Sequence, residues 1–261
     1  MIDSLGWRKK FAIVAPSTNT SVQPEFDEMR ARGVTNHFSR VWIPDDPVES
    51  DEDFNKLMDN IRAELDNAVK RVLTCRPDYL VMGMSSETFW GGLQTSIELK
   101  NRMEDLSGLR VTMGSDACRA ALSCYGEIKR IAVLTPYWPV GDKNVRIFFS
   151  DCGFEVVRMK GLKCNGPVEI AYASPTVLVS AMKELDGTDI DAIVQVGTNL
   201  AMARLAGIAE IFFNKPVLAI NTATYWYALR DSGIDDPIDG FGSLLAEHRE
   251  IPSTFLNTGD Q

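Results

Sequence analysis

The stretch from Phe11 to Thr20 reads FAIVAPSTNT, and a second stretch, from Ile131 to Val140, reads IAVLTPYWPV. Each is a short apolar run that ends at proline and polar or aromatic residues. A second pair has the same character: YLVMGMSSET starts at Tyr79 and AIVQVGTNLA starts at Ala192. The second copy follows the first by 120 positions in one pair and by 113 in the other. This internal repeat indicates two related halves, each with two buried strands that end in polar loops.

Short runs rich in β-branched residues alternate with longer amphipathic stretches along the whole chain, which is typical of a parallel sheet with crossover helices. A long helix is predicted from Asp51 to Thr74, where apolar residues recur at three-and-four spacing. We expect an α/β fold of two pseudo-symmetric parallel-sheet halves, Rossmann-like and flavodoxin-type, with the site in the cleft between them. The first half is expected to hold residues 1–113 plus 217–261, and the second half residues 114–216. The clearest strands are Phe11 to Ala15, Tyr79 to Gly83, Val111 to Met113, Ile131 to Thr135, Ala192 to Val196 and Val217 to Ile220.

The composition excludes several classes of protein. The 261 residues are 45% hydrophobic and 24% charged, with a formal net charge of −9, so a basic surface for nucleic acid or an anionic membrane is not expected. The sequence lacks the apolar run of about 18 residues that a membrane span needs, and we expect a cytoplasmic protein. The five cysteines share no CxxC spacing and there are only two histidines, so no metal site is predicted.

Neither GxGxxG nor GxxxxGK[ST] occurs, so no nucleotide cofactor is expected. The run from Gly83 to Glu87 approaches the GxSxG nucleophile elbow but has Glu87 in place of the second glycine. This near match leaves hydrolytic chemistry open as an alternative.

Four polar loops follow the four repeated strands and would meet at one edge, because ligands of open α/β sheets bind outside the carboxyl ends of the strands. Hydroxyls, amides and backbone N–H groups dominate these loops, and helix N-termini attract anions. We therefore expect a small-molecule carboxylate as the partner, with a homodimer as the default assembly. The loops are Pro16 to Thr20, Gly83 to Thr88, Thr135 to Tyr137 and Gly197 to Asn199.

Gly83 to Gly92 (GMSSETFWGG), followed by Val111-Thr112-Met113 and then Leu134-Thr135-Pro136-Tyr137, resembles the arylmalonate decarboxylase and maleate cis-trans isomerase group of the aspartate/glutamate racemase superfamily. Pro16-Ser17-Thr18-Asn19-Thr20 is most similar to the maleate isomerase form of the first loop. The resemblance covers nearly the whole chain in order. It implies a cofactor-free site between two pseudo-symmetric halves, an enediolate formed beside a substrate carboxylate, and proton transfer by one or two cysteines.

By position, the resemblance assigns Ser85 and Tyr137 to an oxyanion hole, with donors aimed at the developing charge. The backbone of Gly83, Met84 and Ser86 belongs to the same group. Matching positions for a second carboxylate or for substrate orientation are Asn19, Thr198 and Asn199, with Ser17 and Gly197 in the same loops. The family's cysteines correspond to Gly83 and Val196, and neither is a thiol. The last protonation would then fall to Tyr137, Glu87 or a water molecule.

These residues favour a malonate-type decarboxylase, a cofactor-independent lyase acting on a small diacid through an enediolate. The first loop favours the alternative, a cis-trans isomerase of a small dicarboxylate. The missing thiols favour a third class, a member that is hydrolytic or that only binds a ligand. Five aromatic residues fit equally a wall of the cleft or the core: Phe89, Trp90, Trp138, Tyr225 and Trp226.

Overall fold

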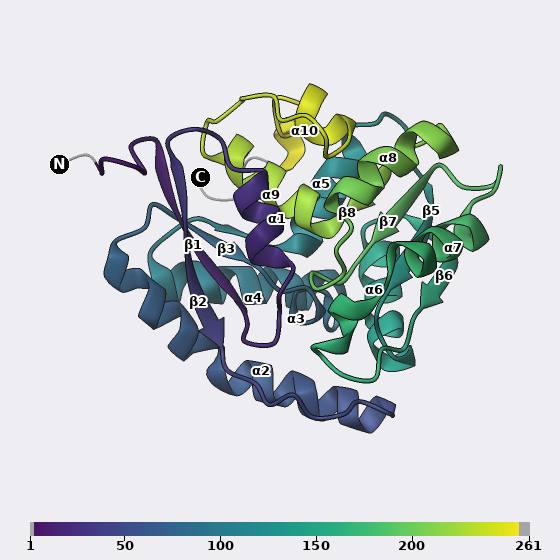
Figure 1. Cartoon of the computed structure of the whole chain (residues 1–261), viewed down its shortest axis with the longest axis horizontal. Helices are drawn as coiled ribbons and strands as arrows, with labels where there is room; N and C mark the ends of the chain where they lie inside the picture. Colours follow the sequence, from purple (N-terminus) through teal and green to yellow (C-terminus); the bar gives the residue numbers. More distant parts are fainter. Residues whose placement is uncertain (1–2, 256–261) are drawn as a thin grey trace.

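The computed structural model describes residues 3–255 and contains two parallel sheets of four strands each, side by side (Figure 1). The strand orders are β2-β1-β3-β4 and β6-β5-β7-β8, so the two sheets have the same topology. The expected fold class is confirmed. The strands are β1 (Lys9–Pro16), β2 (Val34–Val41), β3 (Tyr79–Met82), β4 (Val111–Thr112), β5 (Arg130–Thr135), β6 (Glu155–Gly161), β7 (Ala192–Gln195) and β8 (Val217–Ala219).

The sequence repeat corresponds to the two central strand pairs. Val14 of β1 faces Met82 of β3, and Leu134 of β5 faces Gln195 of β7 in the equivalent register. All six expected strands are present, but β2 and β6 were not predicted. Both lie at sheet edges, and most of their side chains are only partly buried. A strand of this kind lacks the continuous apolar run by which buried parallel strands are recognised.

The boundary expected at residue 217 is wrong for one strand. β8 pairs with β7 and so belongs to the second sheet, not to the first half of the chain. Consecutive strands often lie side by side in one sheet, and a short apolar run gives no sign of which sheet it will join. The helix after β8 packs against β3, β4 and α1 of the first half. The rest of the expected division remains a prediction.

Ten α-helices lie among the described residues, and none of the helices there is long and apolar enough to cross a membrane. The longest, α2, starts at an N-cap, where Ser50 Oγ accepts a hydrogen bond from Asp53 N at 3.1 Å. It ends two residues before the expected Thr74, in a short 3₁₀ turn. The helices are α1 (Val22–Glu28), α2 (Asp51–Val72), α3 (Ser86–Phe89), α4 (Gly92–Ser107), α5 (Gly114–Ser123), α6 (Pro139–Asp151), α7 (Pro175–Leu185), α8 (Ala203–Phe213), α9 (Ile220–Asp231) and α10 (Ser243–Glu247).

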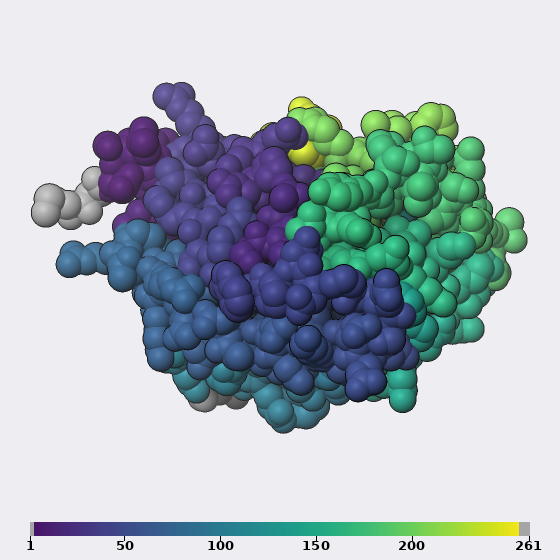
Figure 2. Space-filling view, turned by 60° about the horizontal axis from the view of Figure 1, so that its bottom comes forward, coloured from purple at the N-terminus to yellow at the C-terminus, as the bar shows by residue number. Residues whose placement is uncertain are grey.

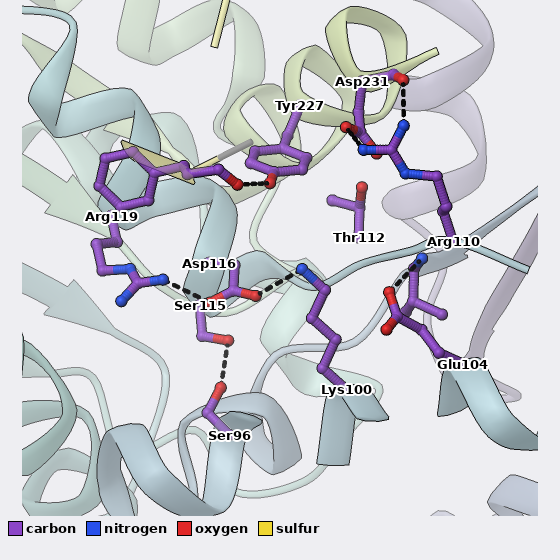
Figure 3. A network of polar contacts seen from close by, with 12 residues as sticks. Ser96, Lys100, Glu104, Arg110, Thr112, Ser115, Asp116, Arg119, Tyr227 and Asp231 are labelled. Atoms are coloured by element: carbon purple, nitrogen blue, oxygen red, sulfur yellow. Dashed lines mark hydrogen bonds and ion pairs between the residues drawn. The ribbon is translucent and has the colours of Figure 1, made fainter. Parts of the chain in front are cut away.

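The helices that follow β4 and β8 pack against each other where the two sheets meet. Gly114 of α5 permits this approach, because a Cβ there would come within 2.6 Å of the Ile220 side chain on α9. A polar network that includes residues of α4, α5 and α9 ties the same region together (Figure 3). In it, Asp116 of α5 lies 3.4 Å from both Lys100 of α4 and Arg119. These contacts connect α4 to α5, which packs against α9.

Candidate active site

A small cavity of about 60 Å³ lies at the carboxyl ends of the central strands of both sheets. Its rim includes the segments before α2 and before α7, which touch where Val48 N donates to Asn165 O at 2.7 Å. Figure 2 shows the dark blue segment around the start of α2 against the green second half. The cavity is lined by Pro16, Thr18, Asn19, Ile43, Phe54, Leu57, Ile61, Met84, Ser85, Ser86, Pro136, Tyr137, Pro167, Ile170, Gly197, Thr198 and Asn199.

A pair of hydroxyls joins the two halves inside this cavity. Ser85 Oγ and the Tyr137 phenol oxygen lie 2.6 Å apart, and the backbone N–H of Thr198 donates to Ser85 Oγ at 3.1 Å. Burial raises the pKa of Tyr137 above its ordinary value, so the phenol keeps its proton near neutrality. The two hydroxyls share one hydrogen bond but carry two protons. Whichever is the donor, one O–H remains for a ligand.

The backbone beside Tyr137 is fixed by a chain of bonds from α6. Tyr137 N donates to Thr135 Oγ1 at 3.1 Å, and the Thr135 hydroxyl donates to the Asp142 carboxyl group. Burial raises the pKa of Asp142 to about 6. On the other side, the ring of Phe54 meets the Tyr137 ring edge-on at 5.3 Å between centroids. The phenol is therefore held from α6 and from α2.

The side chains of Asn19 and Asn199 form hydrogen bonds mainly with the surrounding loops. Asn19 Oδ1 accepts from the N–H groups of Ser21 and Val22 at the start of α1, and its Nδ2 donates to Thr198 Oγ1 at 3.1 Å. Asn199 Oδ1 accepts from the first loop, at 2.9 Å from Thr20 N. Its Nδ2 donates to Pro167 O at 2.9 Å. In this structure the hydrogen bonds of these two side chains are therefore made to the protein itself, and their expected role in holding a second carboxylate or orienting the substrate stays a prediction.

Neutral donors remain for a ligand. Thr198 Oγ1 accepts from Asn19 and keeps its own proton. The backbone N–H groups of Ser85, Ser86 and Asn199 find no acceptor elsewhere in residues 3–255. No charged side chain belongs to the cavity lining. Hydroxyls and peptide N–H groups arranged in this way can bind a carboxylate and stabilise negative charge that develops on it.

The structure brings eight of the twelve predicted site residues to the cavity: Asn19, Met84, Ser85, Ser86, Tyr137, Gly197, Thr198 and Asn199. Ser17 is exposed instead, and its hydroxyl bonds to the backbone of Ile43. Glu87 lies outside the lining, where its carboxylate accepts two bonds from Arg62 Nε at 2.9 and 3.0 Å. Burial raises the pKa of Glu87, although Arg62 opposes the shift. The geometry thus argues against Glu87 as the proton donor.

Gly83 and Val196, the two positions that correspond to the family's cysteines, occupy equivalent places in the two sheets. Each donates its N–H to a central strand at 2.8 Å, Gly83 to Val14 O and Val196 to Leu134 O. A Cβ on Gly83 would come within 3.0 Å of the Val22 side chain. No thiol lines the cavity, and Cys118 is fully buried in α5, where burial raises its pKa to about 12.

The apolar wall of the cavity was not predicted from the sequence. Phe54, Leu57 and Ile61 come from the helical stripe of α2, which was interpreted only as core-facing. Ile43 and Ile170 come from the segments after the unpredicted edge strands. Of the two positions left open for the five aromatic residues, the wall of the cleft is excluded, because none of them lines the cavity: Phe89, Trp90, Trp138, Tyr225 and Trp226.

Within residues 3–255, no group of three or more His, Cys, Asp or Glu side chains is placed to hold a metal ion. Fold and cavity together define an α/β protein of two pseudo-symmetric halves, with a site of neutral donors at the strand ends between them. The chain belongs to the arylmalonate decarboxylase family, whose sequence profile matches residues 50–245.

The relatives include enzymes with two different names. A maleate isomerase of Pseudomonas putida is 25% identical over 247 residues, which cover 89% of this chain and 95% of the relative. A Nocardia farcinica maleate cis-trans isomerase with a bound succinylcysteine intermediate has a TM-score of 0.82 at 20% identity, covering 92% and 98% of the two chains. An arylmalonate decarboxylase structure has a TM-score of 0.71 at 18% identity, covering 90% and 98%. This protein is therefore an enzyme of a group that holds both decarboxylases and maleate isomerases.

Proposed function

We propose that this protein is a cofactor-independent decarboxylase of a small malonate-type diacid, acting through an enediolate. One observation carries the proposal: the cavity combines the Ser85–Tyr137 hydroxyl pair with free backbone donors and has no thiol in its lining. Decarboxylation needs stabilisation of developing negative charge more than it needs a nucleophile. The cavity offers such stabilisation from both halves.

In the proposed reaction, one carboxylate of the substrate accepts bonds from Ser85, Tyr137 and the nearby peptide N–H groups. The other carboxylate faces the apolar wall of Phe54, Leu57 and other side chains, where a charge loses its hydration. The bond between the α-carbon and this carboxylate breaks, and carbon dioxide leaves. The electron pair moves into the retained carboxylate and forms the enediolate. A proton from the Tyr137 phenol or a water molecule then adds to the α-carbon, and water restores the phenol.

A maleate isomerase is the second candidate, favoured by relatives that match 89% of this chain. The Nocardia relative holds a succinylcysteine, which is a substrate adduct on a thiol. The lining of this cavity offers no sulfur for such an adduct. Mass spectrometry of the protein with maleate separates the two candidates, because an isomerase of the thiol type gains the mass of the adduct and the proposed decarboxylase does not.

The proposal is tested by proton NMR in deuterated water with malonate, methylmalonate, phenylmalonate and maleate. The expected result is loss of a carboxyl group from a malonate and one deuterium on the product α-carbon. Ser85→Ala and Tyr137→Phe should each lower kcat by about 10²- to 10³-fold, as loss of an oxyanion donor does. Ser96→Ala and Tyr79→Phe are matched controls, because they remove buried hydroxyls that bond Ser115 and Thr112 instead.

Unchanged turnover in both Ser85→Ala and Tyr137→Phe would refute the assigned roles. Conversion of maleate to fumarate would identify the isomerase. If none of the four acids were turned over but one of them raised the melting temperature, the protein would be identified as a binding protein, since a ligand specific to the folded state stabilises it.

A further inference from the structure

A carboxylate lies behind the β7 loop, outside the cavity lining. Glu25 of α1 accepts from Ala203 N at 2.9 Å through Oε1 and from Asn221 Nδ2 at 2.6 Å through Oε2. Among residues 3–255 no Lys, Arg or His side chain forms an ion pair with Glu25, whereas Glu28, one turn further along the helix, pairs with Arg204. Glu25 is therefore held by neutral donors alone, one from the start of α8 and one from α9.

Asn221 joins this carboxylate to the candidate site. Its Nδ2 donates to Glu25 Oε2 and also to Thr198 O at 2.9 Å, so both amide hydrogens are used. Asn221 is 1% exposed, and its Oδ1 has no partner among the described residues. Two acceptors on one side force the NH₂ group to face them and leave the oxygen unpaired. An unpaired buried oxygen costs free energy, so the orientation is imposed by the two acceptors, Glu25 and Thr198 O.

The bond to Thr198 O fixes one peptide of the site. A trans peptide is planar, and its C=O and N–H groups point in opposite directions. Asn221 holds the C=O of Thr198 from outside the cavity, so the N–H of Asn199 points away from Asn221. Asn199 lines the cavity, and its N–H has no acceptor in the described part of the chain.

We propose that Glu25 is a positioning residue that, through Asn221, holds the Thr198–Asn199 peptide so that the Asn199 N–H binds a substrate carboxylate. This inference rests on the proposed function only in assuming that the cavity binds carboxylates. Glu25 touches no reacting atom. Its effect is on the direction of one donor, so its loss weakens the binding of a carboxylate.

Glu25→Gln is the sharpest variant, because it keeps the size of the side chain and offers one acceptor oxygen where two are needed. Calorimetry with malonate, maleate and phenylmalonate measures binding whether or not turnover occurs. We expect the dissociation constant to rise about tenfold or more, the effect of losing a hydrogen bond to a charged group. Glu28→Gln removes the same charge from the same helix and should leave the dissociation constant unchanged.

The route through Asn221 is tested by Asn221→Ala and the double variant. If Glu25 acts through Asn221, the double variant binds no more than twofold weaker than Asn221→Ala alone, because coupled residues are not additive. The proposal would be overturned if the double variant raised the dissociation constant by the product of the two single effects. An unchanged dissociation constant in Glu25→Gln would also overturn it. In the wild-type protein, the Asn199 backbone amide signal should move in the NMR spectrum when malonate is added. A stationary signal would also overturn it, even if the variants failed to fold.

The proposed reaction and this inference fail separately. Binding of a dicarboxylate without turnover, with weaker binding in Glu25→Gln, would refute the decarboxylase and support the role of Glu25. Turnover, with the same dissociation constant in the wild-type protein and in Glu25→Gln, would support the decarboxylase and refute the role of Glu25. If the wild-type protein bound none of the three acids, the role of Glu25 would be refuted together with the carboxylate site.

Discussion

At Gly83 the missing side chain is as informative as the residues around it. A Cβ at this position would lie 3.0 Å from Val22, 3.1 Å from Ile13 and 3.3 Å from Ala15. Contacts this short require the neighbours to move, and Val22 is part of the first turn of α1. The packing of α1 against the end of β3 therefore disfavours a thiol at the place where relatives of this group were expected to carry one.

Gly83→Ala should lower the free energy of unfolding by about 1–3 kcal/mol, the usual cost of overpacking a core. Urea denaturation measures this change. Val22→Ala added to Gly83→Ala should recover part of the loss by making room. Gly166→Ala is the control, since its new Cβ would find no atom closer than 3.7 Å. If Gly83→Ala were as stable as the wild-type protein, α1 would adapt more easily than the structure indicates.

Asp142 gives the stability of the protein a defined pH dependence. Its pKa rises from 3.8 to about 6 on folding because the carboxyl group is buried. The folded state therefore binds this proton more tightly, and the resulting stabilisation is complete below pH 3.8 and lost as the pH rises through 6. The free energy of unfolding of the wild-type protein minus that of Asp142→Asn should fall between about pH 4 and pH 7.

Urea denaturation at four pH values tests this sign. Asp191→Asn is a control with the opposite shift, because the pKa of Asp191 is lowered to about 2 by its bonds to Arg130 and the nearby backbone. Its contribution changes only below pH 4, so its difference curve should be flat over the same range. A flat curve for Asp142→Asn as well would show that the Asp142 carboxyl is not buried in solution.

Among the elements, α2 contributes both to the core and to the candidate site. Its apolar stripe covers the first sheet and continues as Phe54, Leu57 and Ile61 along the cavity. Acidic residues crowd its first turn and Lys70 and Arg71 its last, as the helix dipole favours. This helix was predicted almost to its ends because every local signal agrees with the tertiary structure.

Ser50→Ala should remove the N-cap of α2 and lower the free energy of unfolding by about 1 kcal/mol. The measurement is again urea denaturation. Ser50→Thr keeps an oxygen that accepts from Asp53 N and should stay close to the wild-type value. Equal losses in both variants would mean that the cap bond contributes little.

Edge strands mark the limit of prediction at this scale. β2 and β6 expose part of most side chains, so their sequences, VTNHFSRV and EVVRMKG, resemble loops as much as strands. The segments that follow them carry Ile43 and Ile170 to the cavity. Because the two strands were not predicted, the positions of Ile43 and Ile170 in the cavity wall were not predicted either.

The whole molecule is held together at the candidate site by bonds between loops of the two halves. Asn199→Ala would leave the N–H of Thr20 and the C=O of Pro167 without their partners. Thr20 is exposed, but Pro167 is buried, and an unsatisfied buried group costs about 1–3 kcal/mol, so we expect a loss of at least about 1 kcal/mol. Far-ultraviolet circular dichroism and tryptophan fluorescence should show one common unfolding transition. Asn67→Ala, which removes an exposed bond to Glu64, is the control.

Separate transitions by the two probes in Asn199→Ala would mean that the halves unfold independently once this side chain is lost. A stability equal to that of the wild-type protein would instead show that other contacts suffice. Ala203 of α8 and Glu25 of α1 make one such contact across 178 positions of sequence.

The sequence by itself determined the two repeated halves, the polar strand ends and the absence of thiols at Gly83 and Val196. These follow from local periodicity and from the rule that parallel strands bring their carboxyl ends to one edge. Only the tertiary structure decided that β8 joins the second sheet and that the side chains of Asn19 and Asn199 form hydrogen bonds within the protein. It also decided that Glu25 lies behind Thr198. The reason is physical: a side chain's hydrogen-bond partner depends on which distant segments pack beside it, and no local pattern records that packing.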